Sequence, residues 1–247
     1  KAGGKSVFAL DITTPGSEKL LWEFDDSKLT SKTVKMGYSF SQPTIARLHS
    51  GKWAVVFGNG YESAGNTNGK AALFIVDAVT GELVKSLEVQ GANTVSNGLS
   101  TPKLGDFNAD GVADYAYAGD LQGNMWRFDL MRDRSGPSPV APFKRDDDGA
   151  AALAEFEVSY SGKPLFRALA TNGTSRQAIT SAPSLVRHPT GVGYLVIFGT
   201  GKFYETGDKD GDKSMAQTVY GIWDEETLGY NGSTPNISRS NLQVQTV

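Results

Sequence analysis

Three absences narrow what this chain can be. Its 247 residues include no cysteine; because a secreted domain of this size does not need disulfides, the cellular compartment stays open. No apolar run approaches the roughly 18–20 residues needed to cross a bilayer, so we expect a protein that does not span the membrane. No signal peptide is present, but the chain starts at Lys1 rather than Met, which leaves room for a targeting segment upstream.

Basic surface and catalytic motifs are also missing. The net charge is −3 and no basic stripe occurs, which argues against a nucleic-acid partner. Neither a cysteine nucleophile nor a Gly-x-Ser-x-Gly motif is present. The only two histidines, His49 and His188, fall in equivalent turns of separate repeats, so we expect exposed turn residues and no shared metal or catalytic base. The sequence therefore indicates a protein that is not an enzyme.

Glycine is abundant, and it punctuates short apolar runs that repeat along the chain. This pattern favours many strands joined by tight turns. Three Ser-x-Pro segments, beginning at Ser41, Ser100 and Ser181, each open a first strand and lead through a polar turn to a second strand that ends in glycine. Third strands that end in aspartate occur at 7–11, 73–77, 125–129 and 220–224, and fourth strands at 19–24 and 82–87.

A four-stranded unit that recurs with variable insertions is typical of propeller blades. Such blades bury their faces only by stacking on neighbours, and propellers close into rings of roughly four to eight blades. We therefore predict an all-β chain, residues 1–247, that forms a partial β-propeller of about three to four blades of a larger ring. The longest segment outside the repeats, about 131–178, is predicted as a surface insertion in which 156–160 and 164–170 are candidates for extra strands.

One stretch, from Leu104 to Tyr115, has the residue spacing of a calcium loop. Ca²⁺ takes six to eight oxygen ligands, and a loop that curls around the ion supplies them from alternate positions. The bidentate glutamate of an EF-hand is missing, since Tyr117 stands at position 12, and a strand follows instead of a helix. The predicted ligands are Asp106, Asn108 and Asp110 at positions 1, 3 and 5, the Val112 carbonyl at 7 and Asp114 at 9, with Gly111 as the sharp turn at 6.

The alternative is a polar hairpin turn without an ion, because Asp, Asn and Gly also favour turns. Three carboxylates that converge on one turn would repel each other without a cation, and this favours calcium. In the other two repeats a plain turn, 47–51 or 187–191, fills the same slot. We therefore expect calcium to pin this hairpin and order its neighbours, and a regulatory role is compatible with that.

Other candidate sites have simpler explanations. Asp208, Asp210 and Asp212 share the alternate spacing, but Ala216 stands where the last carboxylate is needed, so we expect a solvated loop. The acidic run 146–148 also reads as solvated, because adjacent carboxylates cannot flank a glycosidic bond. The four tryptophans, Trp22, Trp53, Trp126 and Trp223, lie in strand runs and are predicted to be blade core.

Several motifs together resemble the C-terminal propeller of the PilY1/PilC family, the tip-associated adhesins of bacterial type IV pili. The resemblance covers most of the chain and weakens in the insertion and over roughly the last twenty residues. The loop alone also resembles the calcium hairpins of integrin-type propellers, and the third strands resemble quinoprotein-like repeats. The motifs that carry the resemblance lie at 3–11, 53–61, 106–114, 118–129 and 198–204.

The family resemblance implies a modified quinoprotein-like propeller without redox chemistry. It implies that Ca²⁺, held by the loop ligands, controls pilus extension and retraction, twitching motility and surface attachment. It implies minor pilins and the pilus tip as partners, host-cell or abiotic surfaces as targets, and a place at the cell surface after transit through periplasm and outer membrane. The family's Arg-Gly-Asp tripeptide is absent from this sequence, so integrin binding is not expected.

Two other functions stay open from the sequence. A fragment of a quinoprotein-type dehydrogenase is disfavoured by the missing half of the propeller and by the absence of vicinal cysteines. The other alternative is a generic extracellular calcium-stapled propeller for protein or glycan recognition.

Overall fold

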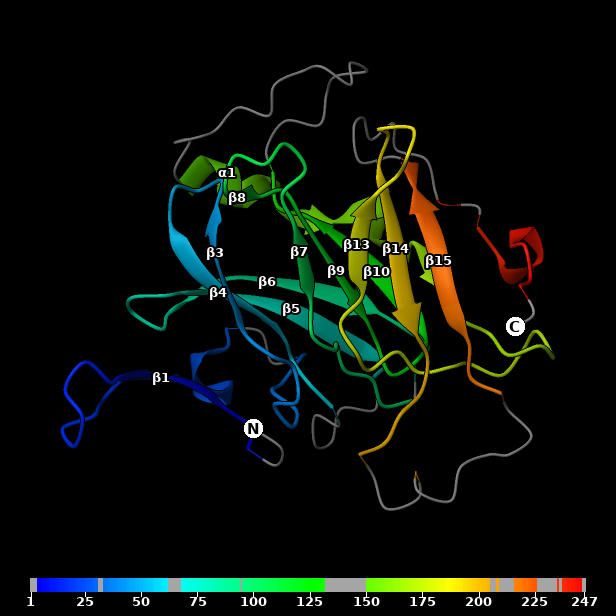
Figure 1. Cartoon of the computed structure of the whole chain (residues 1–247). Coiled ribbons are helices and arrows are strands. Elements are labelled where there is room, and N and C mark those ends of the chain that lie inside the picture. Colours follow the sequence, from blue (N-terminus) through cyan, green and yellow to red (C-terminus); the bar gives the residue numbers. More distant parts are fainter. Residues whose placement is uncertain are drawn as a thin grey trace.

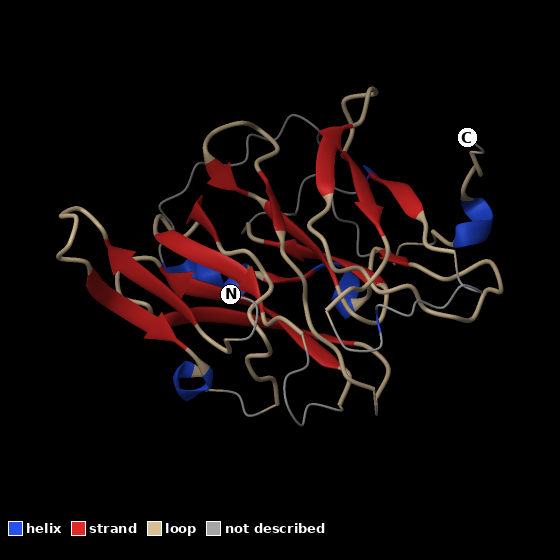
Figure 2. Ribbon diagram, turned by 60° about the horizontal axis from the view of Figure 1, so that its bottom comes forward, coloured by secondary structure: helices blue, strands red, loops and turns tan. Residues whose placement is uncertain are grey.

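A computed structural model describes residues 4–30, 33–61, 68–93, 95–131, 150–204, 208, 216–225, 235 and 237–245. Strands dominate these residues, and Figures 1 and 2 show them as a succession of small sheets arranged around the molecule. Three sheets follow one another along the chain after an N-terminal hairpin, as the repeats predict.

The main strands of each blade run in chain order and pair antiparallel with their neighbours. The N-terminal hairpin consists of β1 (Val7–Asp11) and β2 (Lys19–Phe24). Blade A consists of β3 (Thr44–Leu48), β4 (Trp53–Gly58), β5 (Lys70–Asp77) and β6 (Leu83–Gln90). Blade B consists of β7 (Lys103–Gly105), β9 (Tyr115–Gly119), β10 (Asn124–Asp129), β11 (Glu157–Val158) and β12 (Phe166–Arg167). Blade C consists of β13 (Ser184–Arg187), β14 (Tyr194–Gly199) and β15 (Val219–Asp224).

Helical structure is limited to short segments in the described residues. They include α1 (Ala150–Glu155), α2 (Ser159–Gly162) and the 3-10 turns η1 (Asp26–Lys28) and η4 (Arg239–Asn241). Within α2, Tyr160 and Ser161 both have φ near 55°, so this segment is a left-handed turn. No helix among the described residues is long and apolar enough to cross a membrane.

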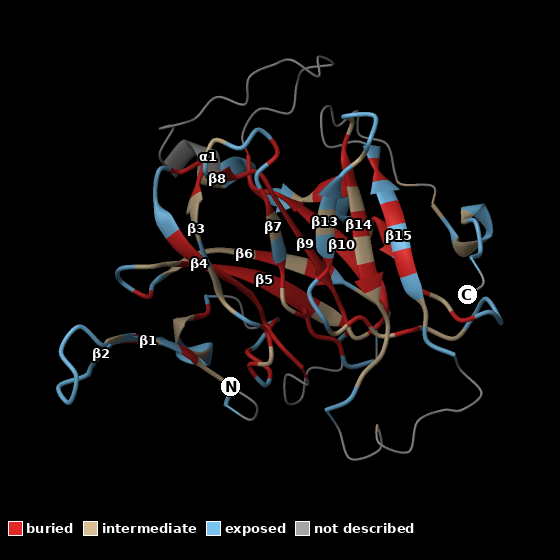
Figure 3. Ribbon diagram, in the orientation of Figure 1, coloured by how far each residue is buried: buried red, intermediate tan, exposed pale blue. Residues whose placement is uncertain are grey.

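The core lies between the sheets, as stacking blades require. Trp22 and Phe24 of the hairpin pack with Phe57 of blade A. Leu73 of blade A belongs to a second cluster with Trp126 and Phe128 of blade B, and a third cluster joins blade B to Val196, Phe198 and Ile222 of blade C. Figure 3 shows the resulting burial, which is most continuous along β5, β9 and β10. The predicted all-β propeller is therefore confirmed.

Part of the predicted insertion is built into the core. The described part begins at α1, and its two short strands, β11 and β12, pair with β10. Phe156, Tyr160 and Phe166 are buried. The candidate extra strands at 156–160 and 164–170 are confirmed as β11 and β12, while the prediction of a surface excursion is wrong for these two segments, because blade B takes its outer pairing partners from them.

The prediction that all four tryptophans are blade core is half wrong. Trp22 and Trp126 are buried, but Trp53 is 58% exposed and Trp223 is 36% exposed. Trp53 alternates along β4 with Val55 and Phe57, so it lies on the sheet face that packs against the N-terminal hairpin.

Candidate metal site

The predicted calcium loop connects β7 to β9 in blade B. Ala109 and Gly111 have φ of 61° and 86°, and these left-handed residues curl the chain so tightly that side chains at alternate positions turn inward. A Cβ on Gly111 would meet no atom within 4 Å, so glycine is favoured there by backbone conformation and not by crowding. The sharp turn predicted at position 6 is therefore present.

The first three predicted ligands come together on this turn. Asp106 accepts hydrogen bonds from the backbone N–H of Asp110 at 3.1 Å and of Gly111 at 2.8 Å. Asn108 Oδ1 also accepts from the Asp110 N–H at 3.1 Å, and Asn108 Nδ2 donates to Asp110 Oδ2 at 3.2 Å. Asp110 Oδ1 in turn accepts from the Val112 N–H at 2.8 Å. Two carboxylates and one amide are thus oriented by the loop's own backbone.

Asp114 lies at the buried side of the loop. Its Oδ2 accepts from the Phe107 N–H at 2.6 Å, and its Oδ1 lies 2.8 Å from Nε2 of His49 in the turn after β3. Burial raises the pKa of the Asp114 carboxyl, while the hydrogen bonds from His49 and Phe107 act in the opposite direction. The Asp106 carboxylate adds a smaller contribution that raises it further.

His49 is therefore not the exposed turn residue that we predict from sequence. It is only 4% exposed, and its ring is committed to Asp114. His188 matches the prediction better: its ring stacks on Trp223 with a centroid distance of 4.0 Å, and its Nδ1 lies 2.8 Å from Thr190 Oγ1. The two histidines differ because the His49 ring reaches Asp114 of the acidic loop, whereas the His188 ring stacks on Trp223.

Val112 contributes to the loop through its backbone. Together with Ala113 it forms β8 (Val112–Ala113), which pairs in parallel with Arg47 and Leu48 of β3. Figure 1 shows β8 beside the end of β3, at the same side of the molecule as α1. The loop is thus attached to blade A as well as to its own blade.

The donor set of the loop fits a hard divalent cation. An ionised carboxylate offers about four acceptor positions, so the oxygens of Asp106, Asp110 and Asp114 keep acceptor capacity beyond the hydrogen bonds they receive. Oxygen from carboxylate, amide and backbone carbonyl is the ligand chemistry that Ca²⁺ prefers. Among the described residues, no group of three or more His, Cys, Asp or Glu side chains is arranged to hold a metal ion. A calcium centre in this loop therefore depends on Asn108 and the Val112 carbonyl as well as on the carboxylates.

The acidic stretch that contains Asp208, Asp210 and Asp212 is described only at Asp208. The acidic run 146–148 lies entirely outside the described residues. Asp208 is described: its Oδ2 accepts from the Tyr204 N–H at 2.7 Å, and its Oδ1 lies 3.4 Å from Lys202 Nζ. Asp210 and Asp212 are outside the described part of the chain. The expectation of a solvated loop there stays a prediction.

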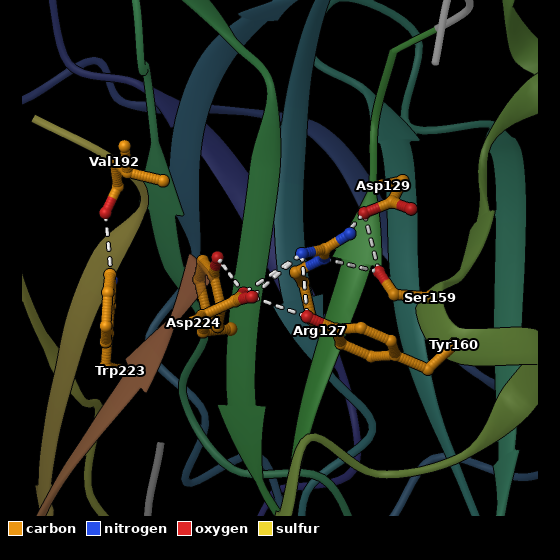
Figure 4. A network of polar contacts seen from close by, with 8 residues as sticks. Arg127, Asp129, Ser159, Tyr160, Val192, Trp223 and Asp224 are labelled. Carbon is orange, nitrogen blue, oxygen red and sulfur yellow. Dashed lines mark hydrogen bonds and ion pairs between the residues drawn. The ribbon is translucent and has the colours of Figure 1, made fainter. Parts of the chain in front are cut away.

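A buried charge network lies between blades B and C, and the sequence did not predict it (Figure 4). Arg127, in the middle of β10, donates from Nε to Asp129 at 2.9 Å and from Nη1 to Asp224 at 3.1 Å. Tyr117 and Tyr160 both donate to the same Asp224 carboxylate. Burial acts to lower the pKa of Arg127, but the Asp224 and Asp129 carboxylates outweigh it and raise that pKa well above its usual value.

The fold and the loop define the class: a β-propeller segment whose blades are joined by buried contacts, with one acidic oxygen-rich turn. Comparison with known proteins identifies the family. The model of the PilY1 beta-propeller domain matches residues 1–247. The chain belongs to this family.

Named relatives agree with this assignment. The type IV pilus biogenesis factor PilY1 of Pseudomonas aeruginosa strain PAO1 is 56% identical over 248 residues, which cover 100% of this chain and 20% of the relative. A PilY1 homolog of Xylella fastidiosa is 35% identical over 258 residues, covering 100% of this chain and 16% of that protein. The crystal structure of the Pseudomonas aeruginosa PilY1 C-terminal domain superposes with a TM-score of 0.88 at 56% identity, covering 98% of this chain and 48% of that chain.

These matches place the chain in context. It corresponds to part of longer proteins, because it spans a fifth or less of each of these two relatives' length. The relatives are named as pilus biogenesis factors and not as enzymes. The family resemblance predicted from the sequence is confirmed. The names of these relatives associate the family with type IV pili.

Proposed function

We propose that this chain is a non-enzymatic, calcium-binding propeller module of a type IV pilus biogenesis and adhesion protein. In this proposal calcium occupancy of the loop sets the balance between pilus extension and retraction, and thereby twitching motility and surface attachment. The observation that carries the proposal is the convergence of Asp106, Asn108 and Asp110 on one turn, with Asp114 on its buried side. A plain turn fills the same slot in the other two blades.

Bound calcium would neutralise the charge of the loop carboxylates and link the start of the loop to its end. Asp106, Asn108, Asp110, the Val112 carbonyl and Asp114 would hold the ion. The chain's own contribution is orientation, since backbone N–H groups hold Asp106 and Asp110, and Phe107 and His49 hold Asp114. With the mutual repulsion of the three carboxylates removed, the start and the end of the loop are tied together at the junction with blade A.

The proposed partners are minor pilins and other components of the pilus tip, with a host-cell or abiotic surface as the attachment target. The proposed location is the bacterial cell surface at the pilus tip, after passage through the periplasm and outer membrane. Support comes from the names of the relatives, which are pilus biogenesis factors. Co-purification with minor pilins from cells separates this proposal from a generic recognition propeller, which should capture none of them.

The functional test uses cells that carry Asp110→Ala or Asp114→Ala in the full-length protein. We expect both variants to lock pili in one state, so that twitching is lost while the protein still reaches the cell surface. Glu82→Ala is the matched control, because Glu82 lies in an exposed surface ion pair with Lys28 far from the loop in sequence. If the variants lose calcium but extension, retraction and twitching stay at the wild-type level, the ion has a structural role only, and the proposed regulatory role is wrong.

A further inference from the structure

The calcium loop is held from both sides by neighbouring blades. On the blade A side, β8 pairs in parallel with the end of β3, and His49 follows that strand directly. On the blade C side, Arg187 of β13 donates to the Phe107 carbonyl, and its guanidinium lies 4.4 Å from the centroid of the Phe107 ring. The Phe107 ring also packs edge-on against Tyr194 of β14, with a centroid distance of 5.2 Å. The loop therefore bridges three blades.

Within this bridge, the His49–Asp114 contact reaches the side chain of a predicted ligand from outside the loop. Asp114 is fully buried, so water is not available to replace a lost hydrogen-bond partner without rearrangement. One carboxylate oxygen is held from inside the loop by the Phe107 N–H, and the other is held from blade A by His49. With Asp114 ionised, as a calcium ligand must be, its oxygens only accept, and His49 Nε2 is then the donor. Two donors from different elements fix the carboxylate plane.

We propose that His49 is a positioning residue for the calcium loop, and that it couples the metal occupancy of blade B to blade A. This inference rests on the proposed calcium-binding function. Residues that hydrogen-bond metal ligands orient them, and their removal typically lowers metal affinity by roughly 10–100-fold. His49 also anchors the turn after β3, so a change in the position of Asp114 is passed to the β3–β4 hairpin of blade A.

A second histidine in the chain, His188, serves as a control for the positioning role of His49. His188 occupies the equivalent turn of blade C, and its ring contacts Trp223 and Thr190. Among the residues that the structure describes, the hydrogen bonds and the stacking contact of the His188 ring involve Thr190 and Trp223 and not the acidic loop. A general effect of removing a turn histidine should therefore be the same at both positions, whereas an effect on calcium should follow His49 alone.

The experiment is a calorimetric calcium titration of the full-length protein with wild-type sequence, His49→Ala, His49→Asn, His49→Gln, His188→Ala and Asp114→Ala. We expect His49→Ala and His49→Asn to bind calcium roughly 10–100-fold more weakly. His49→Gln should recover part of the affinity, because its amide nitrogen reaches the position of Nε2. His188→Ala should bind as wild type does. If His49→Ala fails to fold, the difference between His49→Gln and His49→Asn decides the question.

Hydrogen exchange supplies a second readout that a merely structural histidine would not move. In the wild type, calcium should slow amide exchange in the turn 48–52 as well as in the loop, and His49→Ala should remove the effect on 48–52. Wild-type affinity in His49→Ala, with Asp114→Ala unable to bind, would overturn this inference and leave the proposed function intact. Absence of calcium binding in the wild type would instead remove the proposed function itself.

Discussion

Arg127 and Asp224 join blades B and C across a fully buried interface. Arg127 Nη1 lies 3.1 Å from both carboxylate oxygens of Asp224, and both side chains are at most 1% exposed. Tyr117 and Tyr160 add two hydroxyl donors to the same carboxylate (Figure 4). Asp224→Asn would leave Arg127 paired with Asp129, but it would replace an acceptor oxygen with an amide donor beside three buried donors, the Arg127 guanidinium and the two tyrosine hydroxyls.

We therefore expect Asp224→Asn to lower the free energy of unfolding of the propeller by about 1–3 kcal/mol for each buried donor left without an acceptor. The measurement is urea unfolding followed by tryptophan fluorescence. Glu82→Gln is the control: it removes the exposed Lys28–Glu82 pair and should cost at most about 1 kcal/mol. An Asp224→Asn transition indistinguishable from that of the control would show that the network does not hold the blades together.

The second prediction concerns the exposed face of blade A. Ile45 of β3 pairs with Val55 of β4, so Ile45, Trp53 and Val55 share one face. Val55 is covered by the N-terminal hairpin, but Ile45 is 66% and Trp53 is 58% exposed. The solved relative continues well beyond the part that this chain matches, and blades bury their faces by stacking. We expect the isolated chain to be poorly stable or oligomeric, and Trp53 to be shielded in the longer protein.

Quenching of Trp53 fluorescence by iodide, measured in the isolated chain and in the full-length protein with Trp53→Phe as the reference, checks this shielding. Analytical ultracentrifugation checks the oligomeric state of the isolated chain. A monomeric sample with a sharp, concentration-independent melting transition would count against an incomplete propeller.

The third prediction concerns redox chemistry. The family resemblance implies a quinoprotein-like propeller, but the relatives are named as pilus factors and the sequence has no vicinal cysteines. We expect no turnover of alcohols or sugars when pyrroloquinoline quinone is added, and no quinone absorbance in the purified protein. Dye reduction above the protein-free rate under those conditions would restore the dehydrogenase alternative.

Most strands of the fold can be predicted from the sequence, because each repeat marks them by a local pattern of residues. Apolar runs that end in Gly or Asp predict β4 and β14 with the bounds the structure has, and the fourth strand predicted at 19–24 is β2. Such strands are readable because their alternation and their closing turns lie within a few neighbouring residues.

Non-local contacts are what the sequence cannot supply. β8 is two residues long and pairs with a strand more than sixty positions earlier, so no periodicity marks it. His49 looks like a turn histidine until the loop of the next blade covers it. Arg127 carries a weak signal, since an arginine inside an apolar strand needs buried partners, but nothing local identifies Asp224 as one.

The most direct test of this account is a calorimetric calcium titration of the wild type, Asp110→Ala and Asp114→Ala, combined with hydrogen exchange in chelator. The loop has no bidentate glutamate, so we expect a dissociation constant of roughly 10⁻⁷ to 10⁻³ M, with Mg²⁺ a poor competitor because it demands a tighter octahedral shell. Both substitutions should abolish binding. In the wild type, chelator should raise amide exchange over 106–118 far more than over 55–58. Calcium binding by both variants at the wild-type level would contradict the ligand assignment.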